Sequence, residues 1–340
     1  PEHARQLKEL HIQRIELVVV NLYPFEQATS REDLPFEEAI EQIDIGGPTM
    51  VRAAAKNFLG TGVLVDPDDY ERICDELKTH EGSLTQSTRL ELAQKAFRHT
   101  AHYDAVIARV LSPRTQTDRL PGVLTVSERK ELTLRYGENP HQSAALYGTF
   151  GSFFEKLHGK ELSYNNILDI QAAAGLSDEF DSPSAVIVKH NNPCGAASGQ
   201  TPVEAYRDAL ATDPKSAFGG IVSLNRRLDV EIARELEGIF LEVVIAPEFD
   251  DEALNFLKKK KDRRIIRQRR PGQAADILEI RAVTGGLLVQ ERDTRGISPE
   301  LVKVVTKRPP TPAELESLIF AWRVAKHVKS NAIVYARGTR

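Results

Sequence analysis

The stretch that decides the fold lies near the middle of the chain, at residues 185–195, and its sequence is AVIVKHNNPCG. Four apolar residues followed by polar residues and turn formers predict a strand that is buried on both faces of a parallel or mixed sheet. Such a strand delivers the residues after it to the carboxyl edge of the sheet, where ligands of open α/β sheets bind. We therefore expect an α/β fold with a functional site at residues 189–192.

The polar residues of this stretch suit catalysis. Lys189 can stabilise developing negative charge, and His190 can accept or donate a proton near neutral pH. The amides of Asn191 and Asn192 can orient a polar substrate. Polar residues also follow strands in ordinary surface turns, so this stretch alone leaves open a solvated Lys189 and a His190 that caps a backbone group.

The composition excludes several classes of protein. A chain of 340 residues is long enough for two domains, and 41% apolar with 28% charged residues is typical of globular proteins. With 45 basic and 49 acidic residues, the net charge of -4 gives no indication of a nucleic-acid surface. No apolar stretch is long enough to cross a bilayer and no signal-peptide pattern is present, so we expect a cytoplasmic protein without a membrane partner. Cys74 and Cys194 are too few for a disulfide framework or a four-ligand zinc site.

The first third of the chain predicts a small α/β unit. Residues 15–20 are interpreted as a buried strand, with Asn21 and Tyr23 in the loop that leaves it, and residues 62–65 as a second short strand. Tyr23 taken alone is explained by packing over the core at least as well as by catalysis.

A glycine pair, Gly46 and Gly47, follows Asp44 and precedes a proline and good helix formers. This order is typical of a loop that feeds a helix N-terminus, and such a terminus attracts phosphate. Lys56 lies about two turns beyond Thr49, on the same side of that helix. The Gly-Lys-Ser/Thr order of a Walker loop is absent.

The regular pattern breaks at residues 112–130, which is the best candidate for a domain boundary. Before the break, Thr88 and Glu91 can form a capping box for a long helix. After it, the basic stretch 258–270 contains two isoleucines and is interpreted as a solvated helix or an edge strand. A strand is predicted at residues 332–336.

In the second part of the chain, Arg135 stands beside Tyr136. This pair suits an anionic, planar ligand, because the guanidinium binds phosphate or carboxylate while the ring stacks. A solvated arginine beside a core tyrosine remains an open alternative. Gly219 and Gly220 precede a predicted strand and permit a ligand to approach the backbone closely.

Eight segments, taken together and in order, resemble one family. They are similar to the bacterial bifunctional purine biosynthesis proteins, which join a phosphoribosylaminoimidazolecarboxamide formyltransferase to an inosine monophosphate (IMP) cyclohydrolase. The resemblance covers essentially the whole chain, and although any one segment is a weak signal, eight in one order are specific. The segments are 21–25, 43–57, 135–142, 162–173, 188–196, 216–220, 305–308 and 329–332.

The resemblance implies a fold and two activities. The fold would be α/β throughout: a partial cyclohydrolase domain with a parallel, methylglyoxal-synthase-like sheet at residues 1–120, a linker at 121–132, and a cytidine-deaminase-like transferase domain at 133–340. The transferase would move a formyl group from 10-formyltetrahydrofolate to aminoimidazole carboxamide ribonucleotide (AICAR), giving FAICAR. The cyclohydrolase would close FAICAR to IMP with loss of water.

The resemblance also implies roles for residues of the transferase. His190 would be the general base, Lys189 would stabilise the tetrahedral oxyanion, and Asn331 would help to hold folate or substrate. The implied substrate-binding residues are Arg135, Tyr136, Asn166, Phe218, Gly219 and Glu242.

In the cyclohydrolase, the resemblance implies that Tyr23, Asp44 and Lys56 orient and polarise the formyl oxygen. The residues implied near the nucleotide are Asn21, Gly46 and Gly47. Folate would be a cosubstrate, no catalytic metal is expected, and the family works as a homodimer on AICAR and FAICAR. The family's segments before Pro1 and after Arg340 are missing here, so we expect the intact parent to be active and the isolated 340-residue fragment to be inactive.

Two other classes of function are open alternatives. A zinc-dependent nucleoside deaminase would share part of its signature with Pro193 and Cys194, but it needs a cysteine at the position of Ala197 and a glutamate two residues after the ligand histidine. A noncatalytic nucleotide-binding module would bind nucleotide tightly while His190→Ala left turnover unchanged in the parent protein.

Overall fold

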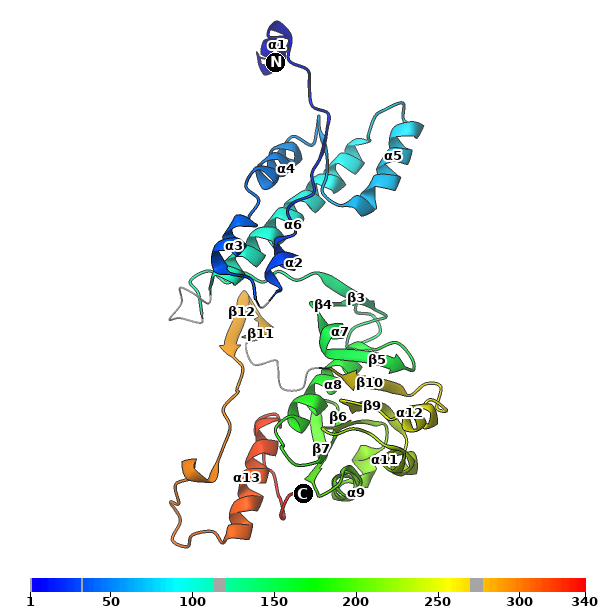
Figure 1. Ribbon diagram of the computed structural model, residues 1–340, viewed down its shortest axis with the longest axis vertical. Helices are drawn as coiled ribbons and strands as arrows, with labels where there is room; N and C mark the ends of the chain where they lie inside the picture. The colour runs from blue at the N-terminus through cyan, green and yellow to red at the C-terminus, as the bar shows by residue number, and fades with distance from the viewer. Residues whose placement is uncertain (1, 32, 113–119, 270–277) are drawn as a thin grey trace. The chain divides into compact units, whose positions relative to one another are not determined.

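The computed structural model describes residues 2–31, 33–112, 120–269 and 278–340 (Figure 1). The chain divides into two compact units, Pro1–Glu128 and Arg129–Arg340, and each contains both helices and strands. Part of the predicted domain boundary, residues 113–119, lies outside the described residues. Over the described ranges, none of the helices combines the length and the apolar character needed to cross a bilayer.

The first unit packs helices against a two-stranded parallel sheet. Its core joins Val51 of α4, Val63 of β2 and Leu92 of α6, all of them almost fully buried. The elements are α1 (Glu2–Glu9), β1 (Leu17–Val19), α2 (Phe25–Thr29), α3 (Phe36–Glu41), α4 (Gly46–Lys56), β2 (Gly62–Leu64), a 3₁₀ turn (Pro67–Asp69), α5 (Tyr70–Thr79) and α6 (Gln86–Leu111).

Strand β1 differs from the buried strand predicted at residues 15–20. It spans three residues, and Leu17 and Val19 are 38% and 51% exposed. Among the described residues β2 is its only strand neighbour, so one edge and part of one face of β1 remain open. Strand β2 is buried throughout, as predicted.

The second unit is built on a six-stranded mixed sheet. Its elements are β3 (Lys130–Leu134), β4 (Ala144–Tyr147), α7 (Phe150–Phe153), β5 (Phe154–His158), α8 (Tyr164–Ser177), β6 (Ser184–Lys189), β7 (Asn192–Ser198), α9 (Pro202–Thr212), α10 (Pro214–Ala217), β8 (Gly220–Leu224), α11 (Val230–Glu235), a 3₁₀ turn (Leu236–Gly238), β9 (Leu241–Ala246), α12 (Asp251–Leu257), β10 (Arg264–Gln268), β11 (Leu278–Val283), β12 (Gly286–Glu291), a 3₁₀ turn (Pro299–Leu301) and α13 (Pro312–Lys326).

The order of strands in the large sheet is β5-β10-β9-β8-β6-β7. Strands β8, β9 and β10 are parallel to one another, whereas β6 runs antiparallel to both β8 and β7. The end of β6 therefore lies at the edge where the three parallel strands begin. We expected residues 189–192 at the carboxyl edge of a parallel or mixed sheet. The sheet is mixed, and this edge is the carboxyl end of β6 but the amino end of β8, β9 and β10.

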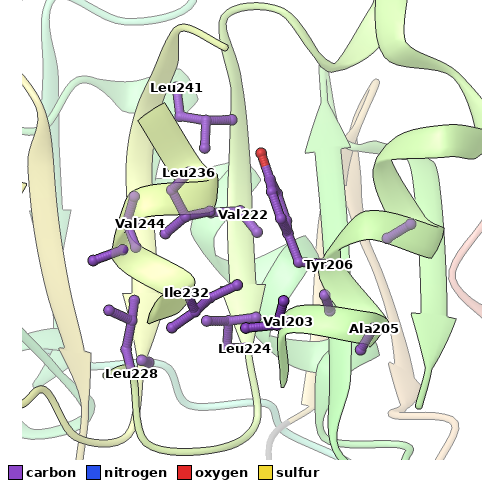
Figure 2. Packing of buried hydrophobic residues seen from close by; sticks show 14 of the residues in the cluster. Val203, Ala205, Tyr206, Val222, Leu224, Leu228, Ile232, Leu236, Leu241 and Val244 are labelled. Atoms are coloured by element: carbon purple, nitrogen blue, oxygen red, sulfur yellow. The ribbon is translucent and has the colours of Figure 1, made fainter. Parts of the chain in front are cut away.

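Both faces of this sheet are covered, which explains why strand β6 is a continuous apolar run. On one face, Ile187 packs with Tyr206 of α9 and Ile232 of α11, and Figure 2 shows the Tyr206 ring lying among aliphatic side chains of this cluster. On the other face, Val186 packs with residues of α8 and α13. The side chains alternate between the two clusters with the period of two that a strand requires.

Two predicted elements near the end of the chain are wrong. The basic stretch contains β10, which lies between β9 and β5 and buries Ile265 and Ile266 completely, so it is neither a helix nor an edge strand. Residues 332–336 form no strand; their apolar Ile333 and Tyr335 are exposed.

Candidate active site

The candidate site of the second unit lies where β6 ends. Lys189 is the last residue of β6, and register places Val188 beside Ile221 near the start of β8. Gly220 at the start of β8 pairs with Leu241 at the start of β9, and Arg264 at the start of β10 pairs with Val243. One edge of the sheet thus collects the end of β6 and the beginnings of three strands.

Strands β6 and β7 are joined by a hairpin loop of two residues. Lys189 pairs with Asn192, which leaves His190 and Asn191 as the loop. Their φ angles are 54° and 60°, and two positive φ angles in a two-residue loop characterise a type I′ turn. His190 is exposed at the tip, so its imidazole is available to a ligand.

The ammonium of Lys189 contacts the segment before β8. Its Nζ donates a hydrogen bond of 2.8 Å to the carbonyl oxygen of Phe218. The next residue, Gly219, has a φ of +73° and donates its backbone N–H to the carbonyl oxygen of Phe240 over 2.8 Å. A residue with a Cβ would be strained at this φ, which explains the glycine.

Two aromatic rings stand at the same edge. Phe218 and Phe240 are 59% and 51% exposed, and their ring centroids lie 5.6 Å apart. Exposed neighbouring rings provide a surface on which a planar heterocycle can stack. Phe240 was missed by the sequence analysis; it directly precedes β9 and lies two residues before Glu242, which the resemblance does assign to the site.

Asn166 and Glu242 are brought together, as their joint assignment to one site requires. The Nδ2 of Asn166 donates to Glu242 Oε2 over 3.1 Å, while its Oδ1 caps the start of α8 by accepting from Ser163 N. A guanidinium nitrogen of Arg264 lies 3.8 Å from the same Glu242 oxygen. Arg264 is a second residue that the sequence analysis missed, because the basic stretch around it was interpreted as solvated.

Asp169 of α8 is a third missed residue. Its Oδ1 accepts a hydrogen bond of 2.6 Å from the backbone N–H of Asn191. Burial raises the pKa of Asp169, and this N–H and the neighbouring His190 partly offset the rise. Asp169 lies in the second turn of α8, and no pattern in the sequence predicts that a polar residue there contacts a hairpin 22 residues further along the chain.

Cys194 does not supply a reactive thiolate. Burial, together with the charge of Asp213, raises the pKa of its thiol to about 11, so the group stays protonated at neutral pH. Within the ranges that the structure describes, no group of three or more His, Cys, Asp or Glu side chains is arranged to hold a metal ion.

Three further candidates are less directly connected to Lys189 and His190: Arg135, Tyr136 and Asn331. The guanidinium of Arg135 lies 4.7 Å from the centre of the Tyr136 ring and donates to the Tyr136 hydroxyl over 2.9 Å. The segment before Asn331 reaches the start of β7, where Lys329 N lies 3.5 Å from Asn192 Oδ1. Among the described residues, no hydrogen bond joins Arg135, Tyr136 or Asn331 to Lys189 or His190.

The first unit brings three of its candidate residues together around Asp44. The Oδ1 of Asp44 accepts from Gly47 N over 2.7 Å, and Oδ2 accepts from Tyr23 N over 3.4 Å. The hydroxyl of Tyr103 accepts from Asp44 N over 2.8 Å. Asp44 thus occupies one backbone amide at the start of α4, that of Gly47, so a phosphate at this helix N-terminus would meet a carboxylate.

The remaining candidates of the first unit are spread out. The glycine pair lies inside α4 rather than in a loop before it, and Gly46 is exposed. Lys56 is the last residue of this 11-residue helix, so it lies about 15 Å along the axis from Gly46. Asn21 is exposed and accepts a hydrogen bond of 3.2 Å from the Tyr70 hydroxyl.

A separate open hollow lies at the opposite edge of the large sheet, after β9 and β10, and is lined by Arg227, Pro247, Glu248, Phe249, Arg267 and Arg269. Its arginines are paired with carboxylates: Arg227 with Asp250, and Arg267 and Arg269 with Glu155. Glu248 in the lining adds a third carboxylate to balance the third arginine, so the hollow offers no surplus positive charge, and none of the chemical groups described above lines it.

A mixed α/β sheet whose edge presents a lysine, a histidine, a carboxylate and two exposed rings has the chemical groups of an α/β enzyme and could accept a planar, polar molecule. The family comparison gives this class a name. A model described as "AICARFT/IMPCHase bienzyme" matches residues 54–340, and one described as "MGS-like domain" matches residues 1–49. The chain belongs to the AICARFT/IMPCHase bienzyme family.

Individual relatives agree with this assignment. The chain is 50% identical over 346 residues to a protein of Chlorobaculum parvum named bifunctional purine biosynthesis protein PurH. It is 52% identical over 343 residues to the protein of the same name from Chloroflexus aurantiacus. These matches cover 99% and 100% of this chain and 66% of each relative, so the chain spans slightly under two thirds of their length.

One solved structure, titled "Crystal structure of ForH", is 37% identical to this chain in sequence. The match covers 32% of this chain and 57% of that one, with a TM-score of 0.30.

Proposed function

We propose that the protein containing this chain carries out two consecutive steps of purine biosynthesis: formyl transfer from 10-formyltetrahydrofolate to AICAR, and closure of the resulting FAICAR to IMP. Membership of the bienzyme family supports both activities. The observation that carries the transferase assignment is the adjacent placement of Lys189 and His190 at the sheet edge that also holds Asn166 and Glu242.

In formyl transfer, the amine of AICAR attacks the formyl carbon and a tetrahedral oxyanion forms. This amine is conjugated with the imidazole carboxamide and is a poor nucleophile, so removal of its proton by a base near neutral pKa accelerates the attack. We assign that role to His190. As the bond from the formyl carbon to N10 of the folate breaks, the same proton passes to N10, and tetrahydrofolate and FAICAR leave.

We assign stabilisation of the oxyanion to Lys189. In the structure its ammonium is held by a carbonyl oxygen, that of Phe218, which the formyl oxygen of the donor would replace as a partner. A positioned cation or donor of this kind typically contributes about 3 to 4 kcal/mol to transition-state stabilisation. Phe218 would stack with the pteridine or purine ring, and Gly219 would let the ring approach the backbone.

For binding, we propose that Arg135, Tyr136 and Asn166 line the nucleotide site and that Glu242 and Asn331 complete the folate site. The charge-assisted hydrogen bonds that a guanidinium makes to phosphate support the assignment of Arg135. A transferase site assembled from several segments fits a homodimer in which a second subunit completes the pocket.

In the cyclohydrolase, the carboxamide nitrogen of FAICAR attacks the formyl carbon and water is lost. We propose that Tyr23, Asp44 and Lys56 orient and polarise the formyl oxygen, with Asn21, Gly46 and Gly47 near the nucleotide. The cluster of Asp44, Gly47 and the Tyr23 backbone supports a shared site. Because Lys56 lies at the far end of α4, this proposal requires it to act from a second subunit or after a rearrangement.

The finer fold and domain assignments also remain proposals. We infer a methylglyoxal-synthase-like cyclohydrolase domain at residues 1–120, a linker at 121–132 and a cytidine-deaminase-like transferase domain at 133–340. A cytoplasmic location fits an enzyme that acts on nucleotides and folate. A zinc deaminase is not proposed, because the family assignment points away from it and Ala197 stands where that chemistry needs a cysteine.

The test measures the formyl-transfer rate of the intact protein with AICAR and 10-formyltetrahydrofolate. The release of tetrahydrofolate is the readout. We expect Lys189→Ala to lower kcat by about two to three orders of magnitude, because it removes the cation that stabilises the oxyanion. His190→Ala should lower kcat by about 10²-fold or more, since it removes the base.

Lys160→Ala is the matched control. Its ammonium pairs with Asp262 over 2.9 Å, is exposed and contacts none of the proposed site residues, so we expect kcat to stay within twofold of the unsubstituted protein. Normal turnover in Lys189→Ala and His190→Ala would contradict the catalytic assignment, and tight AICAR binding without any turnover would favour a noncatalytic module.

A further inference from the structure

The loop that carries His190 has a conformation that its residues do not favour. Type I′ turns require positive φ at both central residues and are usually formed by Asn-Gly, whereas this loop is His190-Asn191. A non-glycine residue in the left-handed region costs about 1 to 2 kcal/mol. The loop therefore needs support from outside the hairpin to keep one conformation.

Asp169 supplies contacts of this kind. Its Oδ1 accepts from the backbone N–H of Asn191 over 2.6 Å, a short bond typical of an ionised acceptor. The side-chain amide of Asn191, in the orientation that satisfies both of its ends, also donates to Asp169 Oδ1 and to the Leu168 carbonyl oxygen, each over 3.2 Å. Both the backbone and the side chain of the second loop residue are thus attached to one carboxylate.

The carboxylate itself is held rigidly. Asp169 lies in the second turn of α8, and its neighbours Ile170 and Ala173 are completely buried against the large sheet. Ser163 and Asn166 form a reciprocal capping box that fixes the start of the same helix. Asp169 therefore connects the hairpin to a helix that is anchored in the core.

The same helix links the loop to the other side of the site. Asn166 hydrogen-bonds to Glu242 of β9, and Asp169 hydrogen-bonds to the β6–β7 hairpin. Residues about one helical turn apart on α8 therefore contact both β9 and the hairpin. A side chain that is fixed on a rigid element can preorganise a catalytic loop by holding it in one conformation. Displacement of a reacting group by about 1 Å can lower the rate about 10²-fold.

We propose that Asp169 is a positioning residue for the formyl transfer: it holds the strained β6–β7 loop so that the His190 imidazole and the Lys189 ammonium face the same substrate. This inference rests on the transferase function proposed above. Asp169 touches neither substrate nor folate in this role and acts only through the loop.

The test uses Asp169→Ala, with Asp169→Asn as the variant that keeps the size and one oxygen acceptor. Two readouts are measured: steady-state formyl transfer in the intact protein, and hydrogen–deuterium exchange of the peptide that spans residues 188–195. We expect Asp169→Ala to lower kcat about 10- to 100-fold with KM values within about threefold, and to speed exchange in this peptide. Asp169→Asn should lie between Asp169→Ala and the unsubstituted protein, and it serves as the test if Asp169→Ala fails to fold.

A second substitution separates positioning from general damage. Glycine adopts positive φ without a penalty, so Asn191→Gly should by itself stabilise the turn. We expect the double variant Asp169→Ala/Asn191→Gly to recover kcat to within about fivefold of Asn191→Gly alone. Asp178→Asn, on the residue that follows α8 and contacts Gln268, is the matched control and should leave exchange at residues 188–195 unchanged.

The outcomes are distinct. If kcat and exchange at the hairpin in Asp169→Ala match the unsubstituted protein, or if Asn191→Gly gives no recovery, the positioning role is wrong. If the unsubstituted intact protein shows no formyl transfer, the proposed function fails, while the exchange experiment still decides whether Asp169 holds the loop.

Discussion

At the scale of single residues, Asp44 shows how one side chain constrains its neighbours. Its carboxylate accepts from Gly47 N and fills the space next to that glycine. A Cβ built on Gly47 would lie 2.5 Å from Asp44 Oδ2 and 2.7 Å from Leu22 Cδ2, whereas one built on Gly46 has nothing within 4 Å. Packing therefore requires a glycine at position 47, whereas the space around Gly46 would accept a side chain.

Gly47→Ala should lower the free energy of unfolding by about 1 to 3 kcal/mol, because the added methyl displaces Asp44 or Leu22 from a packed position. Gly46→Ala is the matched control: a methyl fits there, and replacing glycine in a helix stabilises by about 0.4 to 1 kcal/mol. Urea unfolding followed by circular dichroism measures both changes. Equal effects of the two substitutions would show that Asp44 does not occupy this space in solution.

At the scale of secondary-structure elements, the start of α6 differs from the sequence prediction. The structure places the N-cap at Thr85, whose Oγ1 accepts from Thr88 N over 3.2 Å. Glu91, the predicted partner in a capping box with Thr88, instead pairs with Arg72 at the surface over 3.0 Å. Glu76 of α5 accepts from the Thr88 hydroxyl and from Thr85 N, so a carboxylate of the neighbouring helix contacts both threonines at the start of α6.

Thr85→Ala should therefore destabilise the protein by about 1 kcal/mol, the usual cost of a lost N-cap. Glu91→Gln should change the stability by less than about 0.5 kcal/mol, because exposed ion pairs contribute little. Thermal unfolding of the two variants measures the difference. A larger loss for Glu91→Gln than for Thr85→Ala would support the capping box predicted from the sequence instead.

At the scale of the whole molecule, the second unit is held together by contacts between segments that are far apart in the sequence. Glu179, which follows α8, accepts from Lys326 Nζ over 2.8 Å and lies 3.0 Å from His327 Nε2 at the end of α13. Nearby, the rings of Phe180 and Phe320 stack with centroids 5.1 Å apart. Burial opposes the ionisation of Glu179, but the hydrogen bonds from His327 and Lys326 outweigh it and lower the pKa to about 2.

This lowered pKa predicts how the attachment of α13 depends on pH. A carboxyl whose pKa is lower in the folded state contributes stability above its unfolded pKa of 4.5 and loses it as the pH falls towards about 2. After allowance for solvent screening of a partly exposed ion pair, we expect a contribution of about 1 to 3 kcal/mol at neutral pH. Glu179→Gln should remove most of it at pH 7 and almost none at pH 2.

Urea unfolding at several pH values measures this effect. Circular dichroism and the fluorescence of Trp322, which lies on α13, monitor the unfolding. Glu316→Gln, at an exposed position on the same helix, is the control and should leave the pH dependence unchanged. If Glu179→Gln and the unsubstituted protein lose stability in parallel between pH 5 and pH 2, the ion pairs of Glu179 do not anchor α13.

Much of the local structure could be predicted because it depends on neighbouring residues. The apolar run of β6, the short strand β2 and the strand that follows Gly219 are short-range patterns, and the structure confirms them. The family, too, was predicted from ordered segments of sequence. The assignments of Lys189, His190 and the other site residues stay predictions, which the turnover of Lys189→Ala and His190→Ala tests.

The sequence by itself determined the α/β class, the family and the apolar strands β2, β6 and β8, since hydrophobic period, turn residues and motif order are properties of adjacent residues. Only the tertiary structure decided that β6 runs antiparallel to β8 and that the basic stretch contains an interior strand. It also decided that Asp169, Arg264 and Phe240 join the candidate site. The physical reason is that strand direction, burial and carboxylate partners depend on which distant segments pack together, and that choice is made by the whole hydrophobic core.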